Sequence, residues 1–229
     1  MAWQSPCGDF PSIKMFGFFR DNVTEVFTVM KKPFIRYVQQ ELGDDFLLIT
    51  TGLPATWKTE TADEIVKVKH CPMLRSDIIR LEVLKGQDIF DEKVAGNMNN
   101  RLSVYDEVFK RADETLKKSR CAILDATFIT QELRKRAAEI AVKNNKTLVI
   151  LQTQCPKDVS LKRISKRTKE NYESNAITEQ AYLSNVSKFE VVNLDEIKNA
   201  YPSLPIIHVV VDTTKGEQND LYLTAAEKR

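Results

Sequence analysis

The chain has 229 residues, which suits one main α/β domain or at most two small domains and is enough to bury a sizeable core. Lys and Arg total 34 against 32 for Asp and Glu, so the bulk charge gives no general reason to expect a nucleic-acid or membrane partner. No apolar run approaches the roughly 20 residues of a membrane span, and the N-terminus lacks the pattern of a secretory signal. The four cysteines are scattered without metal-ligand or disulfide spacing, which predicts reduced thiols and a cytoplasmic protein.

Residues 1–43 carry Phe, Val, Met and Ile at spacings typical of one or two amphipathic helices, broken near Pro33 and ending at Gly43. We expect this N-terminal helical extension to cover the domain by packing. Docking of a protein partner through these helices is the alternative. Residues 44–229 are predicted to form the main domain.

Short apolar runs and helical patterns alternate along the main domain. Most of the runs are continuously apolar, as expected for strands buried on both faces of a parallel sheet. We expect Thr130 to cap one helix and Asn144-Asn145 to end it, and residues 214–229 to be loosely tethered. The alternation predicts right-handed crossovers and a doubly wound α/β sheet. The apolar runs are residues 46–52, 72–77, 121–128, 147–154 and 206–213, and the helical patterns between them include 58–68, 101–119 and 130–145.

The first apolar run leads into "GLPATWKT" (52–59), which has the spacing of a phosphate-binding loop, G-x-x-x-x-G-K-[ST], with Trp57 in place of the second glycine. In such a loop the backbone N–H groups surround a phosphate, the lysine spans two phosphates and the hydroxyl ligates Mg²⁺. The predicted strand before this segment and the predicted helix after it favour a nucleotide site. The predicted nucleotide-binding residues are Gly52, Leu53, Pro54, Ala55, Thr56, Trp57, Lys58 and Thr59.

Trp57 leaves two loop conformations open. Glycine at this position permits a positive φ and close approach of a phosphate, so the same geometry would strain a tryptophan and weaken nucleotide binding. A slightly different path would let the indole point outward and pack on the following helix, or stack on a base. A purely structural loop, with Lys58 as a surface lysine, is a third alternative.

Charged residues follow the second and third strands, at the edge of an open α/β sheet where ligands bind. Asp77 is suited to orient and deprotonate an acceptor hydroxyl, and Arg80, one helical turn further on, to hold the substrate. A helix N-cap is the alternative for Asp77. Asp125 ends the third strand, where a carboxylate holds Mg²⁺ directly or through water. Thr59 and Asp125 are therefore the predicted metal site, with capping as the alternative for Asp125.

A basic helical stretch, residues 157–171, follows the fourth strand and is predicted to place Arg163 and Arg167 on one helix face. Together with a second helix from 178 to about 190, it forms a predicted lid (157–190). Two arginines there are suited to close over ATP and stabilise the transferring phosphoryl group. Ordinary solvent-facing charge is the alternative.

These segments, together with the tyrosine-bearing helix that leads into "ILDATF", resemble the P-loop kinases of the AAA-type predicted-kinase family, related to zeta-toxin, gluconate-kinase and polynucleotide-kinase domains. The resemblance covers about residues 46–190, and the chain departs from it at Trp57 in the Walker A loop. It implies a P-loop NTPase three-layer α/β/α fold with a five-stranded parallel sheet in the order 2-3-1-4-5, ATP as phosphoryl donor, and Mg²⁺. It further implies that Lys58 and Thr59 bind the phosphates and metal, that Asp77 is the base or a carboxylate that binds the acceptor, that Asp125 lies near the metal and that Arg163 and Arg167 lie in the lid.

The predicted function is an ATP-dependent kinase that moves the γ-phosphoryl group to a hydroxyl of a small-molecule or nucleotide acceptor. Its predicted catalytic residues are Lys58, Asp77, Arg163 and Arg167. The alternative is a degenerate nucleotide-binding protein without transfer activity, which acts as a regulator or scaffold and for which Trp57 is the main support. A kinase that acts on nucleic-acid ends is a narrower form of the kinase hypothesis. Only the basic residues of the lid favour it.

Overall fold

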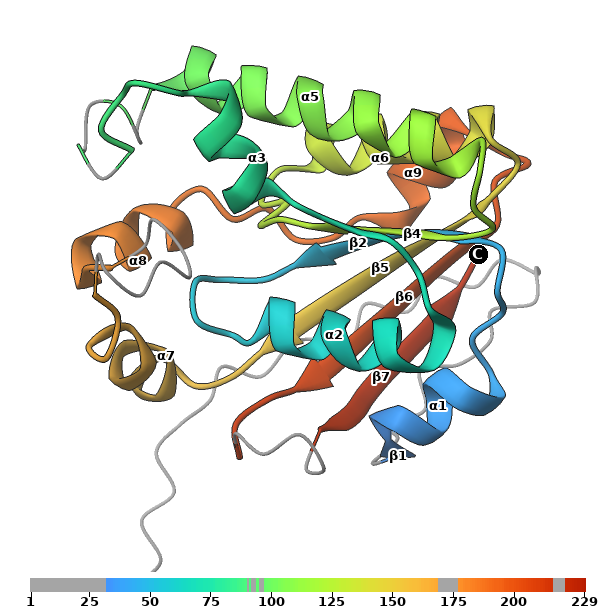
Figure 1. Cartoon of the computed structure of the whole chain (residues 1–229). Helices are drawn as coiled ribbons and strands as arrows, with labels where there is room; N and C mark the ends of the chain where they lie inside the picture. The colour runs from blue at the N-terminus through green and yellow to red at the C-terminus, as the bar shows by residue number, and fades with distance from the viewer. Residues whose placement is uncertain (1–31, 90, 92–93, 95–96, 169–176, 216–220) are drawn as a thin grey trace, which may run out of the picture.

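A twisted sheet with helices on both faces forms the body of the protein (Figure 1), in a computed structural model that describes residues 32–89, 91, 94, 97–168, 177–215 and 221–229. The strand order is β1-β7-β6-β5-β2-β4-β3. Five adjacent strands, from β6 to the edge strand β3, are mutually parallel. Numbered along the chain, these five lie in the order 2-3-1-4-5, which confirms the predicted order of the parallel strands. They are β2 (Phe46–Thr51), β3 (Met73–Arg75), β4 (Ala122–Asp125), β5 (Thr147–Gln154) and β6 (Ile206–Asp212).

Two antiparallel strands extend the parallel core, so the prediction of five strands is wrong for the whole sheet, which has seven. β7 (Tyr222–Lys228) pairs with β6, and the short β1 (Lys32–Pro33) pairs with β7. The expectation that residues 214–229 are loosely tethered is therefore wrong where β7 forms. An antiparallel strand can leave one face to solvent and so needs few apolar residues. Here Leu223 of β7 and Leu221, which directly precedes the strand, pack into the core.

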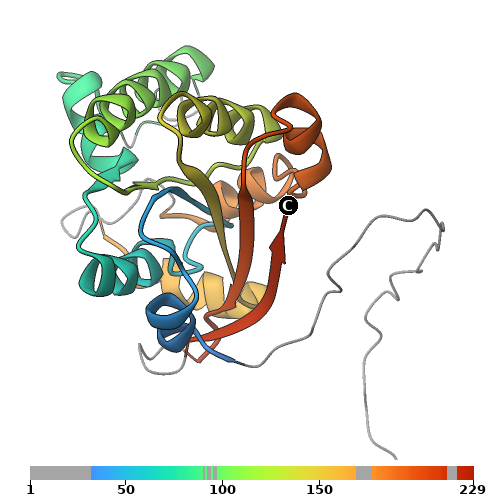
Figure 2. The same ribbon diagram turned by 90° about the vertical axis from the view of Figure 1, so that its right-hand side faces the viewer.

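The alternation of side chains along β2 divides the core into two layers. Leu47 and Ile49 pack into one hydrophobic cluster, and Phe46 and Leu48 pack into the other. The helices on the two faces can also be followed in Figure 2. The predicted three-layer α/β/α arrangement is therefore present. The first cluster involves α3 (Ser76–Val83), α5 (Met98–Leu116), α6 (Gln131–Lys143) and α9 (Leu194–Ala200), and the second α1 (Phe34–Gln40) and α2 (Lys58–Lys69).

The described part of the N-terminal extension packs on the domain. α1 begins directly after Pro33, where the sequence predicted a helix break. Phe34 and Val38 are buried in the same cluster as Ile65 of α2. Residues 1–31, which make up most of the predicted extension, lie outside the described residues.

The ends of α6 agree with the sequence prediction. The Thr130 hydroxyl accepts a hydrogen bond from the Leu133 N–H and caps the start of the helix. Asn144 caps its end, and Asn145 takes a φ of 52°, which a helix cannot continue.

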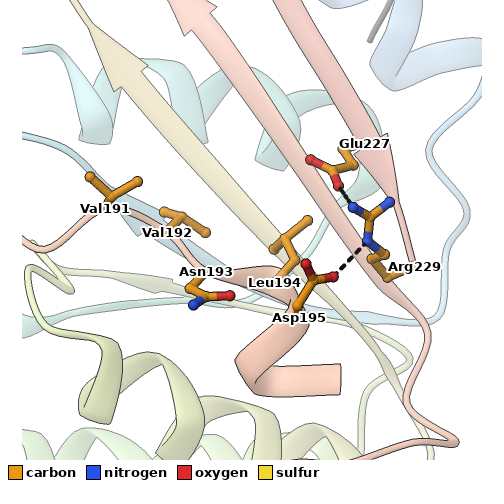
Figure 3. A pocket seen from close by; sticks show the side chains of 7 residues that line it. All are labelled: Val191, Val192, Asn193, Leu194, Asp195, Glu227 and Arg229. Atoms are coloured by element: carbon orange, nitrogen blue, oxygen red, sulfur yellow. Dashed lines mark hydrogen bonds and ion pairs between the residues drawn. The ribbon is translucent and has the colours of Figure 1, made fainter. Parts of the chain in front are cut away.

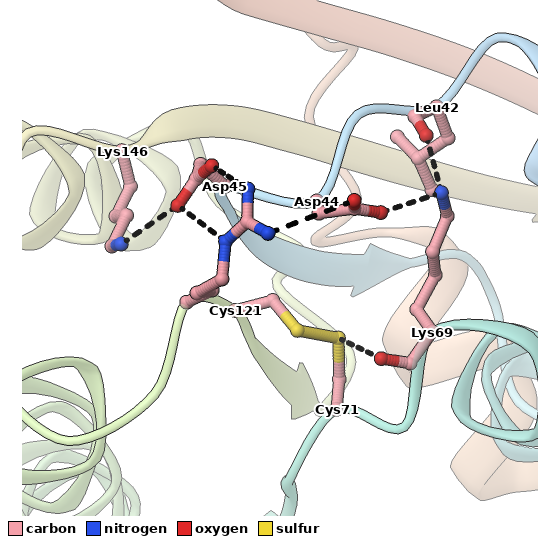
Figure 4. Close-up of polar contacts among 8 residues, drawn as sticks. Leu42, Asp44, Asp45, Lys69, Cys71, Cys121 and Lys146 are labelled. Atoms are coloured by element: carbon pink, nitrogen blue, oxygen red, sulfur yellow. Dashed lines mark hydrogen bonds and ion pairs between the residues drawn. A yellow bond between two sulfur atoms is a disulfide. The ribbon is translucent and has the colours of Figure 1, made fainter.

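A disulfide joins Cys71 and Cys121 (Figure 4), so the expectation of reduced thiols is wrong for this pair. These cysteines are 50 positions apart in the sequence, but they precede the neighbouring parallel strands β3 and β4, and their Cα atoms are 5.5 Å apart. Charged residues lie around this end of the sheet: Asp44 pairs with Lys69, and Asp45 pairs with Arg120 and Lys146. Within the described residues, no helix is long and apolar enough to cross a membrane.

Candidate active site

The predicted phosphate loop joins β2 to the first turn of α2. Gly52 has a φ of 144°, and a Cβ there would lie 2.6 Å from the backbone oxygen of Thr153, so a larger residue does not fit. Ala55 and Trp57 have φ values of 61° and 58°, in the left-handed region. Trp57 therefore adopts the strained conformation considered from the sequence. For an L-residue this conformation costs about 1–2 kcal/mol, and it needs support from neighbouring groups.

The support for Trp57 comes from Arg163 on α7 (Lys157–Ile164). The guanidinium carbon lies 4.4 Å from the centroid of the Trp57 ring, in a cation–π contact. Arg163 Nη1 also donates to the Ala55 carbonyl (3.1 Å), and Nη2 donates to the Thr213 carbonyl (2.5 Å). The indole therefore packs against the arginine that the sequence assigned to the lid.

Lys58 and Thr59 lie in the first turn of α2, where the loop motif predicts them. Lys58 Nζ donates to the Leu53 carbonyl across the loop (2.9 Å). Burial lowers the pKa of Lys58, and the negative charge of Asp125 opposes this effect. The Thr59 hydroxyl donates a 2.6 Å hydrogen bond to Asp125 Oδ2. The loop and the tip of β4 therefore meet at this point, although 66 positions separate Thr59 and Asp125 in the sequence.

The Asp125 carboxylate is buried and held by several polar groups. The Thr50 hydroxyl donates to Oδ1 (3.1 Å), and Arg75 Nε forms an ion pair with Oδ2 at 3.8 Å. Asp125 therefore accepts from the hydroxyls of Thr50 and Thr59 and does not cap a helix. A hydroxyl and a carboxylate oxygen are ligand types that Mg²⁺ prefers, and Mg²⁺ usually takes its other ligands from water and phosphate. Thr59 and Asp125 therefore fit a magnesium site, and the described residues contain no cluster of three or more His, Cys, Asp or Glu that would form a protein-only site.

Asp77 lies within the first turn of α3, and Arg75 occupies the N-cap position, so the alternative capping role for Asp77 is absent. Burial raises the pKa of Asp77, the positive charge of Arg80 lowers it, and Asp125 raises it. Arg80 Nε and Nη1 are buried and make no hydrogen bond within the described residues. Asp77 therefore lies within electrostatic reach of both Arg80 and Asp125, and Arg80 keeps two polar atoms that the described residues leave unused.

The predicted lid differs from its sequence description. α7 ends at Ile164, so Arg167 lies beyond the helix and does not share a helix face with Arg163. The positive charge of Arg167 contributes to the lowered pKa of Lys58, so Arg167 lies within electrostatic reach of the loop. α8 (Glu179–Val186) supplies the second lid helix and ends before the predicted residue 190. Residues 169–176 of the predicted lid lie outside the described residues.

Three threonines that the sequence analysis did not select, Thr50, Thr153 and Thr213, make hydrogen bonds to the loop or to Asp125. The Thr213 hydroxyl donates to the Thr56 carbonyl (3.1 Å), and the Thr153 and Thr56 hydroxyls are 2.7 Å apart. Thr50 contacts Asp125, as described above. Each of them lies at or directly after the carboxyl end of a parallel strand, and this position is the signal that would have identified them.

A cavity of about 420 Å³ lies away from these residues, between the segment that precedes α9 and the end of β7 (Figure 3). Its charged side chains pair with one another, because Arg229 contacts both Asp195 and Glu227. None of the predicted site residues lines it. The candidate active site is therefore the cluster around the phosphate loop.

Comparison with protein families matches residues 47–192 to the family described as an AAA domain. This range holds the loop, Asp77, Asp125 and both arginines of the lid. No curated protein matches the chain.

Several solved structures share the fold at low sequence identity. A putative kinase from Chloroflexus aurantiacus is 19% identical with a TM-score of 0.57, over 78% of this chain and 92% of that one. A sugar kinase from Janibacter sp. is 13% identical with a TM-score of 0.52, over 76% and 87% of the two chains. The AvrRxo1-ORF1:AvrRxo1-ORF2 complex is 15% identical with a TM-score of 0.54, over 85% of this chain and 62% of that one.

Proposed function

Because the chain belongs to the AAA domain family of P-loop proteins, we propose that it is an ATP-dependent kinase. It transfers the γ-phosphoryl group of ATP to a hydroxyl of a small-molecule or nucleotide acceptor. The observation that carries this proposal is the 2.6 Å hydrogen bond between Thr59 and Asp125. It joins the phosphate loop to the strand tip beside Asp77, so that nucleotide and acceptor groups share one edge of the sheet.

ATP would bind to the loop that starts at Gly52 and ends in the first turn of α2. The N-terminus of α2 and the loop amides favour negative charge. Lys58 is held at the loop by the Leu53 carbonyl and would exchange this bond for the β and γ phosphates. Thr59 and Asp125 would hold Mg²⁺, which neutralises phosphate charge when bound.

The acceptor would lie against α3. Burial raises the pKa of Asp77 above that of an ordinary carboxyl, which makes the carboxylate a better proton acceptor. The unused N–H groups of Arg80 would hold a polar group of the acceptor and orient its hydroxyl toward Asp77. Arg167 would close toward the phosphates and stabilise the charge that develops during transfer.

The test is transfer of labelled phosphate from ATP to a panel of acceptors that includes sugars, sugar acids, nucleosides and nucleotides. The wild type should label one acceptor class in the presence of Mg²⁺, and Asp77→Asn should lose that activity while it retains ATP binding. Asp158→Asn is the matched control, because Asp158 is an exposed aspartate in the first turn of α7. Equal transfer by wild type and Asp77→Asn would contradict the assigned base.

A second candidate function is nucleotide binding without transfer, in a regulator or scaffold. The left-handed Trp57 favours it, because a side chain occupies the position where glycine permits the closest phosphate approach. ATP turnover that disappears in Lys58→Ala would exclude this alternative. Binding of ATP without turnover for any acceptor in the panel would support it.

A further inference from the structure

Arg163 and Thr213 together hold two consecutive peptide groups of the phosphate loop. The Ala55 carbonyl accepts from Arg163 Nη1, and the Thr56 carbonyl accepts from the Thr213 hydroxyl. Arg163 is joined to Thr213 by the bond from Nη2 to the Thr213 carbonyl. The arginine and the threonine therefore act as one unit, which connects α7, the end of β6 and the loop.

This unit fixes the direction of the loop amides. In a trans peptide group the C=O and N–H point to opposite sides. Since Arg163 and Thr213 hold the Ala55 and Thr56 carbonyls, the N–H groups of Thr56 and Trp57 point away from them. Phosphate binding at such a loop depends on the direction of these amides.

Trp57 makes the loop dependent on this support. Glycine would adopt a φ of 58° at no steric cost, but tryptophan does not. The stack of Arg163 on the indole favours the left-handed conformation over the alternatives. The buried Ile164, next to Arg163, packs with Ala55 and Tyr182 and keeps this end of α7 against the loop.

We propose that Arg163 is a positioning residue that acts through Trp57 and holds the phosphate loop in its binding conformation. The inference rests on the proposed function, because it assumes that the loop binds ATP. The effect of Arg163 on ATP affinity then depends on the residue at position 57. The loop depends strongly on Arg163 when position 57 is tryptophan and only weakly when position 57 is glycine, because the bond to the Ala55 carbonyl is then the contribution that remains. A lid arginine that contacts phosphate directly would matter equally in both cases.

The test is a double-mutant cycle with Arg163→Ala and Trp57→Gly, in which ATP-Mg²⁺ binding is measured by calorimetry. Arg163→Ala should weaken binding about tenfold in the Trp57 protein and less than about threefold in the Trp57→Gly protein, given the usual strength of cation–π contacts and charged hydrogen bonds. Lys162→Ala, an exposed lysine on the same helix, is the control and should bind as wild type does. An equal loss in both backgrounds would overturn the proposal.

Two further variants separate position from charge. Arg163→Lys keeps the charge but loses the planar donors, so it should bind ATP as weakly as Arg163→Ala. Recovery of binding by lysine would overturn the proposal and favour direct phosphate contact. Thr213→Val removes the bond to the Thr56 carbonyl and the long 3.5 Å contact with Arg163 Nη1, but keeps the bond from Arg163 Nη2 to the Thr213 carbonyl, and should also weaken binding. Unchanged affinity in Thr213→Val would contradict the role of the unit.

A nucleotide-free readout separates failure of this inference from failure of the proposed function. The chain has two tryptophans, Trp3 and Trp57, so Trp3→Phe leaves Trp57 as the only indole. Without nucleotide, Arg163→Ala should shift the emission of Trp57 and speed hydrogen exchange of the loop amides, while Lys162→Ala should change neither. If both signals stay unchanged in a folded Arg163→Ala protein, the inference is overturned, whether or not the wild type binds ATP.

Discussion

The Thr59 hydroxyl lies 2.6 Å from Asp125 Oδ2 and donates a hydrogen bond to it. This contact brings the first turn of α2 onto the tip of β4. It places a hydroxyl and a carboxylate oxygen side by side, and these are ligand types that suit Mg²⁺.

Loss of the Thr59 hydroxyl should therefore remove metal-dependent chemistry with little effect on the fold. We expect Thr59→Val to reduce phosphoryl transfer by about a hundredfold or more, because one group that stabilises transition-state charge is lost. Thr59→Ser keeps the hydroxyl and should retain most of the activity. The measurement is the initial rate at several Mg²⁺ concentrations, and equal rates for the Val and Ser variants would contradict a role for this hydroxyl.

Substitution of Gly52 should destabilise the protein. Gly52→Ala places a Cβ at 2.6 Å from the Thr153 carbonyl and 2.9 Å from the Thr56 hydroxyl, and it forces alanine into a φ of 144°. We expect a loss of about 2 kcal/mol or more in the free energy of unfolding, as for an overpacked site with backbone strain. Gly43→Ala is the matched control, because a Cβ at Gly43 meets no atom within 4 Å. Similar unfolding midpoints in urea for both variants would show that the loop has another conformation.

The raised pKa of Asp77 predicts a pH signature in stability. Burial makes the pKa of Asp77 higher in the folded protein than the value of about 3.9 in the unfolded chain. The contribution of such a carboxyl to stability is fully present at pH values below the unfolded pKa and is lost as the pH rises through the folded pKa. The asparagine of the Asp77→Asn variant does not ionise, so this variant does not lose stability in that way. The unfolding free energy of Asp77→Asn minus that of wild type should therefore increase as the pH rises from about 4 to neutrality. A difference that is independent of pH would place Asp77 in an ordinary aqueous environment.

The disulfide should contribute to stability and leave the nucleotide site unaffected. It closes a loop across a sequence separation of 50 residues, so replacement of Cys71 and Cys121 by serine should lower the free energy of unfolding by about 2–4 kcal/mol. ATP affinity should stay within about twofold of wild type, because the bond lies at the other end of the parallel strands from the loop. Dithiothreitol should lower the melting temperature of wild type but not that of the double serine variant. An equal response of both proteins would show that Cys71 and Cys121 are not bonded.

Local patterns were enough to predict the parallel core and the loop. β2, Gly52, Lys58 and Thr59 follow one another in the sequence, and the continuously apolar strands identify a buried parallel sheet. The two antiparallel strands were missed because a half-covered strand such as Tyr222–Lys228 carries a weak apolar signal. The sequence analysis placed Arg167 on the same helix as Arg163, but this helix ends at Ile164. It ends there because the residues that follow offer no apolar side chain to bury.

Contacts between distant segments were not readable from the sequence. Ala55 and Arg163 are 108 positions apart, and no local pattern relates an arginine on α7 to a tryptophan in the loop. The same holds for Cys71 and Cys121, which meet only because β3 and β4 are neighbours. Trp57 could be recognised as unusual from the motif, but its conformation and its stack on Arg163 required the structure.

The central claim is that the loop with Trp57 is a working ATP site, and calorimetric titration with ATP-Mg²⁺ tests it most directly. We predict micromolar binding by wild type that is lost in Lys58→Ala and kept in Lys67→Ala, a control on the exposed side of the same helix. Absence of binding by wild type, with binding restored in Trp57→Gly, would contradict the claim and show that Trp57 closes the site.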